Sequence, residues 1–142
     1  LLVPVCMSTT HISWGAVRLE PVWMQTGEAA GFAAALAHQK KIAPGKLSGD
    51  DLTRLLCDRR QLVSFFNDFA TSDSDEWVPA VQYLGTKGFF ADYDARPNQS
   101  LSVGLAKLWA DGFVSLRRGK HDGNALAAQV GKLAPQGDRS FV

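Results

Sequence analysis

The stretch that decides the fold is EPVWMQTGEAAGFAAALAH, residues 20–38. Pro21 suits the first turn of a helix, where the N–H that proline lacks is not needed. Lys40-Lys41 follow the stretch, and cations are favourable at the C-terminal end of a helix. The sequence therefore predicts a helix from residue 21 to about residue 38.

One face of this helix carries only small side chains, because Gly27, Ala30, Gly31 and Ala34 recur at helical spacing. Glycine inside a helix costs about 1 kcal/mol relative to alanine, so two glycines indicate close approach of a backbone or a flat ligand. Tight helix packing without any ligand is the alternative. The other positions are also apolar, and we expect the helix to be buried all round.

The composition is that of an ordinary globular protein. The 142 residues include 15 Lys and Arg against 14 Asp and Glu, a net charge of +1, and 46% are hydrophobic. A single domain of this size can bury a core, so intrinsic disorder is not expected. The charge balance provides no basic field for nucleic acid or an anionic membrane. Because no long apolar run occurs, we expect neither a signal peptide nor a membrane span.

The predicted fold class is mostly α with a short N-terminal β segment. Residues 1–7 have the apolar, β-branched character of a buried strand, and a loop is expected over residues 11–18. The shift in composition near residues 39–50 indicates a boundary between residues 1–45 and a helical accessory module, residues 46–142. Further helices are predicted over residues 50–59 (with a start at residue 48 as the alternative), 77–87, 101–110 (capped by Ser100) and 124–133, with a tail over residues 135–142.

Most motifs of known chemistry are absent. The three histidines, His11, His38 and His121, include no pair at metal-ligand spacing, so no metal site is predicted. Cys6 and Cys57 are far apart and predict neither a disulfide framework nor zinc binding.

Three spaced elements carry a resemblance to a known family: Ser8-x-x-His11, Arg18-x-x-Pro21 and Gly27-x-x-Ala30-Gly31-x-Ala33-Ala34. Residues 1–38 resemble the C-terminal flavin-binding segment of FAD-dependent oxidoreductases related to the fumarate reductase flavoproteins, in particular the xanthan-lyase-like group. The resemblance implies a C-terminal fragment of an α/β FAD-binding fold, with FAD as the cofactor of the parent chain.

The resemblance also implies roles for individual residues. A helix N-terminus can stabilise the electron-rich edge of a reduced flavin. Arg18 would face an anionic group, with a salt bridge to Glu20 as the alternative, and His11 would be a catalytic acid or a hydrogen-bonded loop residue. The implied cofactor-binding residues are Gly15, Arg18, Glu20, Pro21, Val22 and Trp23.

The resemblance implies partners as well. The G-x-G-x-x-G fingerprint that holds a dinucleotide is absent, so the upstream dinucleotide-binding half of the same protein is the expected partner. Hydride transfer to or from a small-molecule substrate would then belong to the parent chain, and these residues alone would not be competent.

Residues 66–110 carry a weaker resemblance, to the S-layer homology repeat. It rests on Phe66-x-Asp68, on Trp77-x-x-Ala80-Val81 and on Tyr93-x-x-Arg96-Pro97. This resemblance implies the alternative function, a non-catalytic helical binding module for a cell-wall polymer or a protein. Its candidate contact residues are the aromatic side chains Trp77, Tyr83, Phe89, Phe90, Tyr93 and Trp109.

Overall fold

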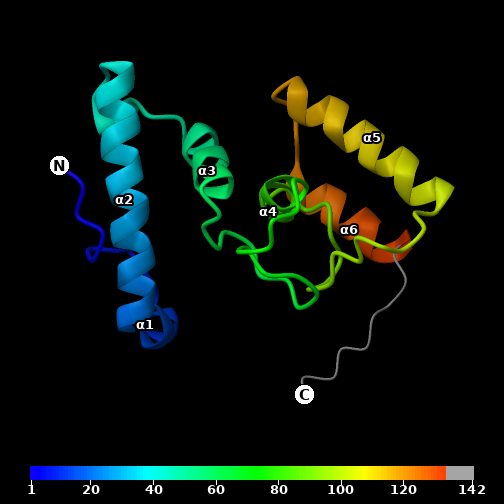
Figure 1. The fold of residues 1–142 in the computed structure, drawn as a ribbon, viewed down its shortest axis with the longest axis horizontal. Coiled ribbons are helices and arrows are strands. Elements are labelled where there is room, and N and C mark those ends of the chain that lie inside the picture. Colours follow the sequence, from blue (N-terminus) through cyan, green and yellow to red (C-terminus); the bar gives the residue numbers. More distant parts are fainter. Residues whose placement is uncertain (134–142) are drawn as a thin grey trace. The chain divides into compact units, whose positions relative to one another are not determined.

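The computed structural model describes residues 1–133, and the chain divides into two compact units, Leu1–Leu56 and Cys57–Val142. All regular structure in the described residues is helical, as Figure 1 shows. The elements are α1 (His11–Val17), α2 (Glu20–Lys40), a short 3₁₀ helix η1 (Pro44–Lys46), α3 (Gly49–Asp58), α4 (Val78–Gly85), α5 (Val103–Arg117) and α6 (Gly123–Leu133).

The expected N-terminal β segment is wrong. Residues 1–7 form no strand, and the Cys6 N–H instead donates to the Val3 carbonyl at 3.1 Å across a turn that contains Pro4. A strand needs a neighbouring strand for its backbone hydrogen bonds, and residues 1–133 offer none. The apolar sequence alone therefore does not make a strand here, and the described fold is all helical.

The loop expected over residues 11–18 is also wrong, because most of it forms α1. Thr10 caps this helix: its hydroxyl accepts from the Ser13 N–H at 3.2 Å, and its carbonyl accepts from the Trp14 N–H at 2.9 Å. None of the α1 residues is buried.

The central helix of the first unit is confirmed as α2, with Pro21 in its first turn. It ends where Lys41 adopts a left-handed conformation with φ of 54°, and the Ile42 N–H donates to the Ala37 carbonyl at 3.0 Å. Burial all round is not observed, because Ala33 and Ala37 are its only buried residues.

The helices of residues 50–59, 77–87 and 124–133 are confirmed to within two residues at each end as α3, α4 and α6. The helix predicted from residue 101 differs more. It begins at Val103, is capped by Ser102 rather than Ser100, and continues to Arg117. The expected tail, residues 135–142, lies outside the described residues.

The second unit has its core where α5 and α6 pack together. Phe89, Leu105, Leu126 and Val130 form this buried cluster, and Gly112 lets the helices approach, since a Cβ there would lie 3.0 Å from the Leu126 side chain. The side chains of Leu84, Phe90, Leu108, Trp109 and Leu116 pack around the cluster.

Candidate functional site

The residues implied in flavin binding gather at the corner between α1 and α2. Gly15 lies in α1, Arg18 is the C-cap of α1, and Glu20–Trp23 form the first turn of α2. The Arg18 N–H donates to the Trp14 carbonyl at 3.1 Å, and only Leu19 separates this cap from the next helix. In Figure 1, α1 lies at the N-terminal end of α2. The sequence therefore brings these residues together through a tight helix-to-helix connection.

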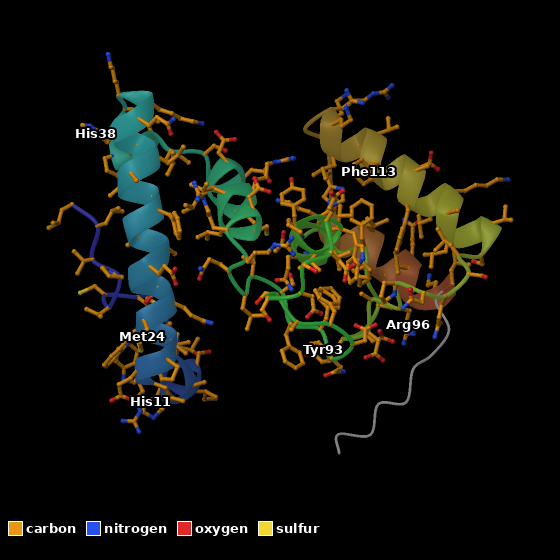
Figure 2. All side chains as sticks on the ribbon, viewed as in Figure 1. His11, Met24, His38, Tyr93, Arg96 and Phe113 are labelled. Atoms are coloured by element: carbon orange, nitrogen blue, oxygen red, sulfur yellow. The ribbon has the colours of Figure 1, made fainter. Side chains whose placement is uncertain are left out.

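His11 lies at the other end of α1 from Arg18. It is the first residue of α1, and the seven residues of that helix separate it from Arg18 by about 10 Å along the axis at 1.5 Å per residue. Its side chain is exposed, and Figure 2 shows it on α1.

The N-terminus of α2 offers fewer free donors than a helix usually does. Pro21 has no N–H, and the Val22 and Trp23 N–H groups both donate to the Leu19 carbonyl, at 3.0 and 3.2 Å. Within residues 1–133, no group accepts a hydrogen bond from the Glu20 N–H. A ligand at this helix end would therefore meet a narrow set of backbone donors.

The predicted alternatives for Arg18 can now be separated. Arg18 and Glu20 form no salt bridge with each other or with any other group of the described chain, and both residues are exposed. The guanidinium of Arg18 is therefore free to meet an anionic or electron-rich group from outside the described residues.

Trp23 supplies a further donor with no acceptor. Its Nε1 atom is buried, yet no group of the described chain accepts its hydrogen. A buried donor without a partner costs about 1–3 kcal/mol. This indole N–H is enclosed by the chain itself, so the donors that remain open to a ligand are the Arg18 guanidinium and the Glu20 N–H. These two match in kind the acceptor atoms at the electron-rich edge of a reduced flavin. The residues present thus fit the implied cofactor.

The small face of α2 is open. A Cβ built on Gly27 or Gly31 would meet no atom within 4 Å, and the same holds for Gly15 in α1. Helix packing within the described chain therefore does not explain these glycines, and the alternative of tight packing without a ligand finds no support inside this chain.

The comparisons with known proteins match the first unit. Residues 1–56 match the sequence model of the family described as FAD dependent oxidoreductase, which is less than half of the chain. These are also the bounds of the first compact unit. No curated protein and no solved structure matches the chain.

The match supports the resemblance at the level of an FAD-dependent oxidoreductase fragment. It does not single out the fumarate reductase-related or xanthan-lyase-like group. Residues 57–142 lie outside the match, and the S-layer homology resemblance gains no support from it.

Most aromatic side chains proposed for the alternative binding function belong to the interior of the second unit. Tyr83 and Phe89 are buried, and Trp77, Phe90 and Trp109 are partly buried. Only Tyr93 among these six is exposed, at 56%. The aromatic spacing therefore mainly reflects core packing.

Two further features bear on the kind of site. Residues 1–133 contain no group of three or more His, Cys, Asp or Glu side chains that could hold a metal ion. The described helices include none with both the length and the apolar character needed to cross a membrane.

The sequence interpretation missed one feature of the site, the helix α1 that carries Gly15 toward the corner. Thr10-x-x-Ser13 is a cap signal, and the two hydroxyl oxygens lie 2.9 Å apart. This signal could have predicted the helix, because a threonine that precedes a helical segment commonly caps it.

Proposed function

We propose that residues 1–56 form part of the flavin site of an FAD-dependent oxidoreductase of the fumarate reductase-related, xanthan-lyase-like group. The observation that carries the oxidoreductase part of this proposal is the family match over the residues that also make up the first compact unit. The narrower group rests on the sequence resemblance of residues 1–38. The corner between α1 and α2 supports it, because Arg18 there has no salt-bridge partner in the described chain.

The residues of the corner have distinct roles in this proposal. Arg18 holds positive charge near the ring, the Glu20 N–H donates a hydrogen bond to it, and Trp23 helps to pack the first turn of α2. Pro21 and Val22 set the first turn of α2, and Gly15 leaves room for the ring. The bound FAD supplies hydride transfer with a small-molecule substrate. His11, as an exposed side chain of α1, would meet substrate rather than the flavin.

The small face of α2 provides the contact with the rest of the enzyme. We propose that Gly27 and Gly31 pack against the dinucleotide-binding half of the same protein, since no atom of the described chain lies near their open sides. The phosphate-binding glycine fingerprint would come from that half, so the 142 residues alone would not bind FAD stoichiometrically.

A direct test is the flavin content of the purified protein. We expect a polypeptide that joins the dinucleotide-binding half to these residues to carry about one FAD per chain, measured by denaturing liquid chromatography with mass spectrometry. The 142-residue chain alone should carry none. A joined polypeptide that folds and contains no flavin would contradict the proposal.

A substitution at the corner tests the residue roles in the joined polypeptide. Arg18→Ala is expected to lower flavin-linked turnover about tenfold, as the loss of one hydrogen bond to a charged group implies. Lys46→Ala is the matched control, because Lys46 is an exposed cation in η1 of the same unit and should leave turnover unchanged. Equal turnover of the wild-type and Arg18→Ala proteins would remove Arg18 from the site.

A further inference from the structure

In the second unit, two irregular segments are joined by hydrogen bonds from backbone donors. The Asn67 N–H donates to the Tyr93 carbonyl at 2.7 Å. The Asp68 carboxylate accepts from the Ala95 N–H at 3.0 Å and from the Arg96 N–H at 2.6 Å. These bonds fix residues 65–69 against residues 92–96, although neither segment is part of a helix.

Arg96 locks the second of these segments. Its guanidinium donates to both carboxylate oxygens of Asp92, at 2.9 and 2.6 Å, and to the Asp94 carbonyl at 3.1 Å. The hydrogen bond to Asp92 raises the pKa of Arg96 above its ordinary value, so the side chain stays charged. The Asn67 side-chain amide donates to the Asp94 carboxylate at 3.1 Å and ties this loop to the first segment.

Each of the two segments exposes one aromatic ring. Phe65 is 58% exposed and Tyr93 is 56% exposed. Their ring centroids lie 5.9 Å apart with an interplanar angle of 72°, an edge-to-face contact. Figure 2 shows Tyr93 at the outer edge of the loops of this unit. We call these two side chains, together with Asp94, the Phe65–Tyr93 surface.

The charge around this surface is negative. Residues 65–69 and 92–96 together contain three carboxylates, Asp68, Asp92 and Asp94, and a single cation, Arg96. The Asp94 side chain remains 35% exposed despite its contacts. An aromatic ring attracts a cation through its negative face, and a neighbouring carboxylate adds to that attraction.

We propose that the Phe65–Tyr93 surface docks a basic segment of a partner protein, with an arginine or lysine side chain of the partner lying on the exposed rings. Charge complementarity favours this occupant, because three carboxylates against one guanidinium leave the two segments with a net negative charge. The surface is preorganised, since hydrogen bonds already hold both segments, and a partner therefore has little loop ordering to supply.

The test is a nuclear magnetic resonance titration of the ¹⁵N-labelled 142-residue chain with a short, capped peptide of alternating arginine and alanine. We expect the amide signals of residues 65–68 and 92–96 to shift with peptide concentration, and the apparent affinity to fall with added salt. Tyr93→Ala should weaken binding about fivefold or more, whereas Tyr93→Phe should retain it because the ring remains.

Phe113→Ala is the matched control, because Phe113 is an exposed ring on α5 outside the two segments, and it should bind the peptide like the wild-type chain. The proposal is overturned if the wild-type chain shows no shifts at these residues, or if Phe113→Ala weakens binding as much as Tyr93→Ala. Equal or tighter binding of a glutamate–alanine peptide or of a neutral oligosaccharide would also overturn it. The proposal is also overturned if the same signals shift when the concentration of the chain is raised without peptide, because the occupant would then be a second copy of the chain.

Discussion

Single polar side chains hold the irregular parts of the second unit. Gln82 is 1% exposed, and its Oε1 atom accepts from the Val63 N–H at 3.0 Å and from the Ser64 N–H at 2.7 Å. In the same way, the Asp68 carboxylate accepts hydrogen bonds from the backbone N–H groups of Ala95 and Arg96. Backbone groups outside helices need such partners because buried donors are otherwise costly. Neither contact follows from helical periodicity, so both were beyond what the sequence predicts.

Cys57 should be chemically inert in the folded chain. It is 1% exposed, and burial raises its pKa to about 11. The thiolate is the reactive form, so at about pH 8 we expect iodoacetamide to label the exposed Cys6 and to spare Cys57. Peptide mass spectrometry measures both sites, and labelling in urea provides the control, where both thiols should react. Equal labelling of the two thiols without urea would contradict the assignment.

The raised pKa of Cys57 also makes the stability of the folded chain fall as the pH rises. The unfolded thiol ionises near its ordinary pKa of 9.0, while the folded thiol keeps its proton to about pH 11. The contribution of Cys57 to stability is therefore complete below pH 9 and is lost as the pH rises toward 11. The free energy of unfolding should fall less steeply across this range for Cys57→Ala than for the wild-type chain.

The backbone conformation and the close packing at position 88 require glycine. Gly88 has φ of +79°, and a Cβ there would lie 2.2 Å from the Gly123 carbonyl oxygen at the start of α6. Gly88→Ala should lower the free energy of unfolding by about 2 kcal/mol or more, measured by urea denaturation. Gly131→Ala is the control, because a Cβ at Gly131 meets nothing within 4 Å, and it should be neutral or stabilise by up to about 1 kcal/mol. A similar loss in both variants would argue against this close contact.

At the scale of elements, the existence of α2 to α6 was predictable, the existence of α1 was missed, and the first residue of each helix was less predictable. Pro21 and the cations after it located α2, and acidic residues located the start of α3, because these signals act within one turn. Ser100 and Ser102 both precede the same apolar run, and local sequence does not choose between them. The strand predicted for residues 1–7 was wrong for a different reason. A strand needs a second strand for its hydrogen bonds, and the pattern of apolar residues does not show whether one is present.

The cap of α5 can be tested directly. The Ser102 hydroxyl accepts from the Leu105 N–H at 3.2 Å. Ser102→Ala should lower the free energy of unfolding by about 1 kcal/mol, since it leaves that donor without its side-chain partner. Ser100→Ala should have no effect, because Ser100 lies outside the helix. Thermal and urea unfolding of the two variants measures these changes. A larger loss of stability in Ser100→Ala than in Ser102→Ala would show that Ser100 is the cap.

At the scale of the whole molecule, the candidate site was predictable only in part. The corner residues Arg18 to Trp23 came from a family resemblance, and the match over residues 1–56 agrees with it at the coarse level. The open side of Gly27 and Gly31 could not be predicted, because sequence shows that small residues are present and not what faces them. The roles of the individual corner residues stay predictions, as does the division at residues 45 and 46.

Two positions on α2 should respond in opposite ways to a larger side chain. Gly31→Leu should leave the free energy of unfolding of the 142-residue chain unchanged or raise it by up to about 1 kcal/mol, because the site is open and leucine favours helix. Ala33→Leu should lower it by about 1–3 kcal/mol, because Ala33 is buried. In the polypeptide that includes the dinucleotide-binding half, Gly31→Leu should instead reduce flavin content. Unchanged flavin content there would show that this face is not the contact.

The open side of Gly27 and Gly31 also affects which substitutions these two positions should accept during evolution. Folding of the first unit exerts no selection for glycine at these two positions, and helix propensity favours alanine at both. Variants of this chain selected only for solubility and folding should therefore accumulate alanine and longer helix formers there. If the proposed contact with a dinucleotide-binding half exists, variants selected for flavin content should keep the small residues. The two sets of variants would then differ first on this one face of α2.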